Sequence, residues 1–325
     1  MATLPRNGCT CRVSFDAVLF DLGRVVLDWV PERPFEQVLA PAEVPAFMER
    51  VDFYEWNRQA DNGRSYADIE AEWCARFPGD TEAILAYRRF TQLAIPGLVP
   101  GVWALVAELQ QHCIRVGALS NWSADTFPQI RERFAALSRF DTMVVSGLDG
   151  VAKPDPAIFA LACDRNQVDP HRAVFIDDLA ANVAAARASG LTGLLFSDAA
   201  QLRTDLLDLG LPVPGTPQTE PIYHWSLATD WVSAQEVGRY PWSTRGVAYE
   251  ATGFVHFSYA DQVALIRQVF FAGLAEDELV LLRLDPQTEL PVLAENGFPH
   301  LYAPLPVSAV VPMAANELGE FHPPE

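Results

Sequence analysis

The sequence predicts an α/β protein: a Rossmann-like parallel sheet with a helical cap insert, followed by a second, smaller α+β domain. Three observations predict this architecture. Short apolar runs alternate with helical patterns over roughly the first 200 residues, a long helical insert separates the first two runs, and a Pro-rich stretch precedes a C-terminal region of different character. The 325 residues, half of them hydrophobic, suffice for two packed cores.

Five apolar runs are expected to form the sheet. Strands that are apolar almost throughout are typical of parallel sheets covered by helices on both faces. The expected strands are Ala17–Phe20, Ile114–Leu119, Met143–Val145, Ala173–Ile176 and Thr192–Phe196. Ligands of such sheets bind at the carboxyl ends of the strands, so polar residues there are the first candidates for a functional site.

The expected boundaries follow from shifts in composition along the chain. We expect an N-terminal tail at residues 1–13, a first domain at 14–209, a linker at 210–221 and an α+β domain at 222–325. The helical insert, at about residues 31–97, carries aromatic residues at helical spacing, and Ser65 with Asp68 suits a capping box. An insert leaving the end of the first strand can fold over the site as a lid.

Composition excludes several functions. A net charge of −19 argues against nucleic acid and anionic membranes as partners. The sequence has no apolar run of about 18 residues and no secretory pattern at its start, so no membrane span is expected. Five cysteines indicate reduced thiols and a cytoplasmic location. No further cysteine cluster follows Cys9 and Cys11, which we expect to be inert.

The use of basic residues singles out one position. Of the 23 basic residues, Lys153 is the only lysine, in a chain that uses arginine everywhere else. Lysine supplies a compact charge that can reach one buried oxygen, which the planar guanidinium of arginine does not match. We therefore expect Lys153 to be functional.

Three expected strand ends and one loop bring catalytic groups together. Asp21 follows the first strand, Ser120 the second and Asp177 the fourth, while Lys153 lies in the loop after the third. A carboxylate in this position can attack phosphorus and form an aspartyl-phosphate. Ser120 can donate to phosphoryl oxygens, and Lys153 can neutralise one oxygen and hold the Asp21 carboxylate.

A magnesium site is expected beside the nucleophile. Asp177 and Asp178, in "FIDDLAANV", supply the hard oxygen ligands that Mg²⁺ prefers, together with Asp21. The backbone carbonyl of Gly23 can complete the set of ligands. The predicted cofactor is therefore Mg²⁺, and the predicted partner is a small phosphorylated metabolite.

Substrate contacts are expected from both parts of the first domain. Arg24 and Asn121 follow the nucleophile and the serine, and Arg58 and Arg64 belong to the insert. For the two insert arginines, a solvated helix surface is the alternative interpretation.

Four segments carry a resemblance to a known family. "FDLGRVV", "ALSNW", "KPDPAIF" and "FIDDLAANVAAARASG" are similar to the four motifs of the haloacid dehalogenase-like hydrolase superfamily, over about residues 14–210. The resemblance implies a Rossmann-like core with a C1 cap. It also implies a nucleophile at Asp21, phosphate binding at Ser120 and Lys153, a metal ligand at Asp178 and a supporting role for Asp177.

The sequence departs from the family pattern at Gly23. Most phosphatases of the superfamily have there an aspartate that acts as general acid and base. The bacterial α-D-glucose-1-phosphate phosphatase-like branch resembles this chain in lacking it, which implies a phosphatase, with a sugar phosphate as a candidate substrate. A water molecule, or a cap carboxylate such as Asp61, is an alternative proton donor in place of the missing aspartate.

Two other interpretations remain open. Haloacid dehalogenases also lack that aspartate, but they work without metal, and the pair Asp177–Asp178 would repel a metal-free carboxylate nucleophile. A catalytically degenerate hydrolase that acts as a binding or scaffold protein is the non-enzymatic alternative.

In the C-terminal region, one histidine stands in each of the three segments "IYHW", "FVHFS" and "FPHLY". One shared pocket is expected, formed by His224, His256, Ser258, His300 and Tyr302, with Glu295 nearby. Zinc is an alternative, although the spacings are long. The segments resemble a small bacterial domain of unknown function, loosely grouped with the ADP-ribosyltransferase-like fold, and this resemblance implies a nucleotide ligand.

Overall fold

The computed structural model describes residues 14–215, 218–286 and 290–313, so the expected tail at 1–13 and its two cysteines lie outside the described residues. The chain divides into two compact units. One is built from the chain up to Val213, and the other from Pro214 onward together with Pro100–Glu108 and Phe134–Ala136.

A five-stranded parallel sheet forms the centre of the first unit, as the sequence predicts. The spatial order is β5-β4-β1-β6-β7. Its strands are β1 (Ala17–Phe20), β4 (Arg115–Ser120), β5 (Thr142–Val145), β6 (Ala173–Asp177) and β7 (Thr192–Leu195). Strands β4 and β6 end one residue later than expected, so Ser120 and Asp177 are the last residues of their strands.

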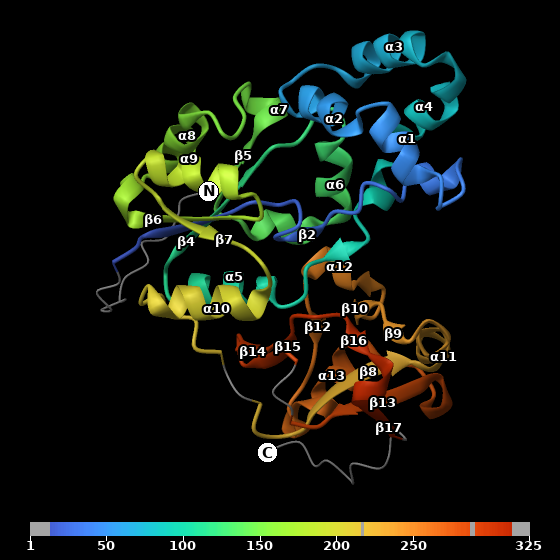
Figure 1. The fold of residues 1–325 in the computed structure, drawn as a ribbon. Coiled ribbons are helices and arrows are strands. Elements are labelled where there is room, and N and C mark those ends of the chain that lie inside the picture. Colours follow the sequence, from blue (N-terminus) through green and yellow to red (C-terminus); the bar gives the residue numbers. More distant parts are fainter. Residues whose placement is uncertain (1–13, 216–217, 287–289, 314–325) are drawn as a thin grey trace. The chain divides into compact units, whose positions relative to one another are not determined.

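Helices cover the sheet because its strands are apolar on both sides. All four residues of β1 are buried, and α8 (Pro156–Asn166) and α9 (Ala180–Ala188) pack along one face (Figure 1). Leu19, Phe159 and Phe175 meet in the core between them. Asp155 begins α8 by accepting a hydrogen bond from the Ala157 backbone N–H, and proline occupies the first turn.

The cap consists of four helices with a core of their own. They are α1 (Val44–Arg50), α2 (Phe53–Asp61), α3 (Tyr66–Arg76) and α4 (Thr81–Arg89), grouped together in Figure 1. Phe35, Phe53, Trp56 and Tyr87 form mutual ring contacts at the centre of this group. Ser65 caps α3 by accepting from the Asp68 N–H, as the capping-box pattern predicts.

Both ends of the cap are tied together where they leave the sheet domain. The short strands β2 (Leu27–Asp28) and β3 (Gly97–Leu98) pair antiparallel, with Leu27 opposite Leu98.

The first unit also contains α6 (Phe127–Arg133), α7 (Ser146–Asp149) and α10 (Ala199–Asp208). The helix α5 (Val102–Gln111) contributes residues to both units.

The second unit is built from antiparallel strands with a few helices. One three-stranded sheet has the order β17-β13-β8 and another the order β12-β15-β14. The strands of these sheets are β8 (Ile222–Leu227), β12 (Val255–His256), β13 (Leu279–Leu284), β14 (Val292–Glu295), β15 (Phe298–Leu301) and β17 (Val310–Met313). The longer helices are α11 (Ala228–Val237) and α13 (Val263–Phe270). Trp225, Phe271 and Leu281 belong to its core.

Two features bear on the sequence predictions. None of the helices in the described part of the chain combines the length and apolar character needed to cross a lipid bilayer. The three cysteines within the described ranges, Cys74, Cys113 and Cys163, are free thiols.

Candidate active site

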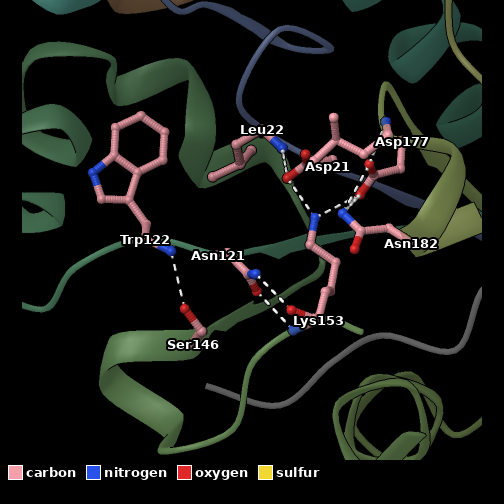
Figure 2. A network of polar contacts seen from close by, with 9 residues as sticks. Asp21, Leu22, Asn121, Trp122, Ser146, Lys153, Asp177 and Asn182 are labelled. Carbon is pink, nitrogen blue, oxygen red and sulfur yellow. Dashed lines mark hydrogen bonds and ion pairs between the residues drawn. The ribbon is translucent and has the colours of Figure 1, made fainter. Parts of the chain in front are cut away.

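Lys153 lies at the centre of a carboxylate cluster at the carboxyl edge of the sheet. Its Nζ is 2.8 Å from Oδ1 of Asp21 and 2.7 Å from Oδ2 of Asp177 (Figure 2). The lysine side chain is only 1% exposed, and the ring of Phe175 lies 5.4 Å from Nζ. Burial alone would lower the pKa of Lys153, but Asp21 and Asp177 together outweigh burial and raise it.

Asp21 stands directly after β1 with its carboxylate fixed by several donors. The Leu22 backbone N–H donates to Oδ1 at 2.7 Å, and the Ser120 side chain also hydrogen-bonds the carboxylate. Burial is the largest influence on its pKa and raises it to about 7, against the effect of Lys153. The side chain is nevertheless accessible from a cavity, as a nucleophile must be.

Asp177 holds the lysine rather than facing the cavity. This residue is fully buried, and its carboxylate accepts from the Leu179 backbone N–H at 2.8 Å and from Asn182 Nδ2 at 3.0 Å to each oxygen. Figure 2 shows Asn182 beside Asp177. No sequence pattern indicated Asn182, which lies in the first turn of α9, five residues after Asp177 at the end of β6.

Asp178 lies on the cavity side of the carboxylate cluster. Asp178 lines the cavity, and Asp21, Asp177 and Asp178 each offer an oxygen within 4.8 Å of the others. Three hard oxygen donors at this separation suit a divalent cation such as Mg²⁺. Arg24 approaches Asp178 with an Nη1–Oδ2 distance of 4.0 Å and lies over the Trp29 ring.

Asn121 joins the end of β4 to the loop that carries the lysine. Its Nδ2 donates to the Lys153 carbonyl at 2.9 Å, and its Oδ1 accepts from the Lys153 N–H at 2.8 Å. Because both hydrogen bonds involve backbone atoms, Asn121 fixes the path of this loop. Asn121 also lines the cavity, so its predicted substrate contact stays a prediction.

A cavity of about 310 Å³ opens between the sheet and the cap. The sheet domain contributes Asp21, Gly23, Ser120, Lys153 and Asp178. The cap and the adjoining loops contribute mostly aromatic and polar side chains, namely Trp29, Tyr54, Asn57, Arg58, Asp61, Tyr66, Tyr87 and Trp122. Asp21, Ser120, Lys153 and Asp178 therefore face a single space, whereas Asp177 does not line it.

The two predicted cap arginines differ in position. Arg58 lines the cavity, although its guanidinium is paired with Glu55 on the same helix, with a shortest separation of 2.7 Å. Arg64 lies outside the cavity lining and is paired with Glu72 at 2.6 Å and with Gln59. The geometry thus gives Arg64 no contact with the space in front of Asp21.

The three histidines of the predicted pocket, His224, His256 and His300, lie near one another. His224 Nδ1 is 2.6 Å from the His256 carbonyl, and the ring centroids of His256 and His300 are 5.0 Å apart. Burial lowers the pKa of His224 and of His256 to about 4, so both rings are neutral at pH 7. The Nε2 atom of His224 is buried without a hydrogen-bond partner.

Further polar groups surround His300. Tyr302 donates to Glu295 Oε2 at 2.5 Å, and His300 Nδ1 lies 3.4 Å from the same oxygen. Ser258 pairs with Tyr223 through backbone hydrogen bonds. Within the described ranges, the one group of three or more ligand atoms that lie close enough to share an ion is formed by Asp21, Asp177 and Asp178, so the zinc alternative for the histidines stays a prediction. The nucleotide ligand stays a prediction.

The fold and the site together define a hydrolase with a Rossmann-like core of parallel strands and helices. The chain belongs to the haloacid dehalogenase-like hydrolase family, whose model matches residues 15–190, as the four motifs predict. Residues 226–313 match a second family, described as a protein of unknown function (DUF952).

Three similar proteins illustrate the range of relatives. A sesquiterpene phosphatase of Aspergillus oryzae is 26% identical over 57% of this chain and 91% of its own length. An acyl-CoA dehydrogenase family member 10 of Mus musculus is 38% identical over 64% of this chain, but over only 20% of its own length. A HAD family enzyme of Bacteroides thetaiotaomicron, solved in complex with magnesium and inorganic phosphate, is 19% identical over 57% of this chain and 95% of its own, with a TM-score of 0.45.

Proposed function

We propose that the first domain hydrolyses phosphate monoesters of small metabolites through an aspartyl-phosphate on Asp21, with Mg²⁺ as cofactor. The observation that carries this proposal is the position of Lys153 between Asp21 and Asp177, with Ser120 and Asp178 beside them at one cavity. A nucleophilic carboxylate, a fixed cation and oxygen ligands for a metal are the groups that phosphoryl transfer requires.

In the first step, an Asp21 oxygen forms a bond to phosphorus while the bond from phosphorus to the leaving oxygen breaks. Lys153 and the Ser120 hydroxyl bind phosphoryl oxygens as charge accumulates on them. The leaving oxygen takes a proton and departs as an alcohol. Lys153 remains within hydrogen-bond distance of Asp21, so it also orients the nucleophile.

In the second step, a water attacks the phosphorus of the aspartyl-phosphate and gives up a proton. The bond between phosphorus and the Asp21 oxygen breaks, which releases inorganic phosphate and restores the carboxylate. Asp21, Asp178 and the Gly23 carbonyl would hold a divalent cation, whose positive charge would offset the repulsion between phosphate and carboxylates.

The cavity walls favour a leaving group with both apolar faces and hydroxyls. Aromatic rings from Trp29, Tyr54 and Tyr87 offer flat apolar surfaces, and Asn57 and Arg58 offer hydrogen-bond donors. A sugar ring has this combination of C–H faces and hydroxyl groups. A sugar phosphate, with the anomeric phosphate first, is therefore the proposed substrate class.

The test is phosphate release from 4-nitrophenyl phosphate and from a panel of sugar phosphates, with Mg²⁺ or with a chelator. We expect turnover that requires Mg²⁺ and that Asp21→Asn lowers by about 10⁴- to 10⁶-fold, because the nucleophile is lost. The matched control is Asp28→Asn, an exposed carboxylate seven residues further on that does not line the cavity.

Three outcomes would contradict the proposal. Halide release from 2-haloacids without metal, in place of phosphate release, would identify a C–halogen hydrolase. Absence of any turnover in the wild type, or turnover that Asp21→Asn leaves intact, would leave the site without the proposed nucleophile.

A further inference from the structure

The nucleophile has no proton donor two residues further on. Gly23 occupies that position, and a Cβ placed there would meet no atom within 4 Å. The space next to Gly23, from which a side chain could donate a proton to the leaving oxygen, is therefore open. Any acid for the leaving group has to come from another element.

Asp61 reaches the same cavity from the cap. It is the last residue of α2, and it lines the cavity together with Asp21 and Lys153. Sequence position alone does not bring it there, because 40 residues separate it from the nucleophile.

Both the cap and the sheet domain fix the position of Asp61. Asn57 Nδ2 donates to Asp61 Oδ2 at 3.0 Å, and the Asn57 Oδ1 in turn accepts from the Tyr66 hydroxyl at 3.1 Å. From the sheet domain, the Ser123 backbone N–H donates to the Asp61 carboxylate, and the Ser146 hydroxyl donates to the Asp61 backbone carbonyl at 2.5 Å. Such support suits a group that must meet a reacting atom.

The electrical environment of Asp61 favours a carboxyl that exchanges its proton near neutral pH. The pKa of Asp61 is raised to about 7, first by burial and next by the charge of Asp21, while Lys153 and the hydrogen bond from Ser123 oppose this rise. A general acid works best with a pKa near the operating pH, because it must be protonated for one step and ionised for the next.

We propose that Asp61 is the catalytic general acid and base that replaces the absent side chain at position 23, an inference that rests on the proposed phosphatase function. As the phosphorus–oxygen bond to the leaving group breaks, the Asp61 proton moves to the leaving oxygen. The resulting carboxylate then takes a proton from the water that attacks the aspartyl-phosphate. Asp61 is thereby protonated again when phosphate leaves.

The test compares substrates that differ in their need for the acid. 4-Nitrophenolate leaves without protonation, whereas an alkyl or sugar oxygen does not. In single-turnover experiments with Mg²⁺, we expect Asp61→Asn to slow release of a sugar alcohol by about 10²- to 10⁴-fold, and release of 4-nitrophenolate much less. The wild-type rate should depend weakly on the pKa of the leaving alcohol, and the variant rate steeply.

A matched control and a repositioned acid separate chemistry from folding. Asp52→Asn changes an exposed carboxylate at the start of the same helix, and it should leave both rates unchanged. Adding Gly23→Asp to Asp61→Asn places a carboxyl in the open space beside the nucleophile, and we expect it to restore part of the rate with sugar phosphates. A residue that merely anchors the cap could not be replaced in this way.

The outcomes also distinguish this inference from the proposed function. Turnover that Asp21→Asn abolishes, but that Asp61→Asn lowers equally for both leaving groups or not at all, would overturn the role of Asp61 and keep the phosphatase. Loss of the phosphatase itself would appear as wild-type turnover that is absent or independent of Asp21.

Discussion

At the scale of single residues, Lys153 connects the stability of the first domain to its chemistry. Its ammonium contacts two carboxylates inside the protein, and no other side chain shown in Figure 2 carries a positive charge. Breaking a buried ion pair by removing one partner leaves an uncompensated charge, which costs far more than the loss of an exposed pair.

Replacing this lysine tests that connection. We expect Lys153→Met to lower the free energy of unfolding by about 3–5 kcal/mol in the absence of divalent cations, because Asp21 and Asp177 then face each other without a cation. Lys153→Arg should also abolish turnover, since the planar guanidinium cannot occupy the same point. Urea denaturation gives the free energies.

Arg172→Met is the control for this measurement. The pair Arg172–Asp16 is about half exposed, so its loss should cost less than about 1 kcal/mol. An equal loss of stability in the two variants would contradict the view that Lys153 compensates buried charge.

Some site residues could be predicted from the sequence and others could not, for a physical reason. Asp21, Ser120 and Lys153 could be assigned because strand ends and their loops converge at one edge of a parallel sheet. Asn182 was missed, since its role depends on which face of α9 meets Asp177. The position of Arg64 could not be predicted from the sequence either, because its pairing with Glu72 depends on how α3 packs.

At the scale of elements, the contact between α7 and the loop after β4 shapes one wall of the cavity. Gly147, in α7, lies so close to this loop that a Cβ would stand 2.4 Å from the Ala124 N and 2.6 Å from the Trp122 O. Both are backbone atoms, which cannot rotate away. The Ser146 hydroxyl accepts from the Trp122 N–H at 3.0 Å at the same place (Figure 2).

Gly147→Ala is therefore expected to push the loop away from α7. We predict a loss of about 1–3 kcal/mol in unfolding free energy, typical of an overpacked site, together with a reduced kcat/KM, because Trp122 lines the cavity. Urea denaturation and steady-state kinetics measure the two effects. Gly79→Ala is the control, since a Cβ there meets nothing within 4 Å. Unchanged stability and kinetics in Gly147→Ala would refute this close contact.

Elements were predictable to the extent that their signals are local. The strands of the sheet are short apolar runs bounded by turn residues, and Ser65 marks the start of α3, so each could be located within a few residues. The pairing of β2 with β3 was not anticipated, because it joins two-residue segments about 70 positions apart. No local pattern encodes such a pair.

At the scale of the whole molecule, the buried titratable groups of the two units respond to pH in opposite directions. The pKa values of His224 and His256 are lowered to about 4, below the ordinary value near 6.5, so the unfolded chain binds protons that the folded domain does not. The stability that these groups contribute is present above pH 6.5 and is lost as the pH falls toward 4.

The carboxyl groups of the first unit have the opposite effect. Burial raises the pKa of Asp21 and Asp61 to about 7, so in the absence of divalent cations the folded domain binds protons that the unfolded chain releases. Their contribution is present below about pH 4 and is lost as the pH rises toward 7.

Acid should therefore weaken the second unit selectively. In the full chain with chelator, we expect its unfolding temperature to fall between pH 6.5 and pH 4.5, and this fall to be smaller in His256→Asn. Asparagine does not titrate there and can still accept from Ser243, whose hydroxyl lies 2.9 Å from His256 Nδ1. Calorimetry with limited proteolysis assigns each transition to its unit. Identical pH profiles for wild type and variant would contradict the assignment.

The presence of two domains could be predicted from composition, whereas the function of the second unit could not. The Pro-rich segment after residue 209 and the change in character beyond it predicted two domains. The arrangement of the three histidines arises from antiparallel pairing, with His256 opposite His300, which sequence spacing does not specify.

The position of Lys153 has a practical consequence for spectroscopy. Since the sequence contains a single lysine, protein grown with isotope-labelled lysine would carry one labelled amine, and that amine lies between Asp21 and Asp177. A magnetic resonance spectrum of such a sample contains one side-chain signal and no background from the surface. Binding of a cation, of phosphate or of a substrate could each be followed from that one resonance, without any substitution in the chain.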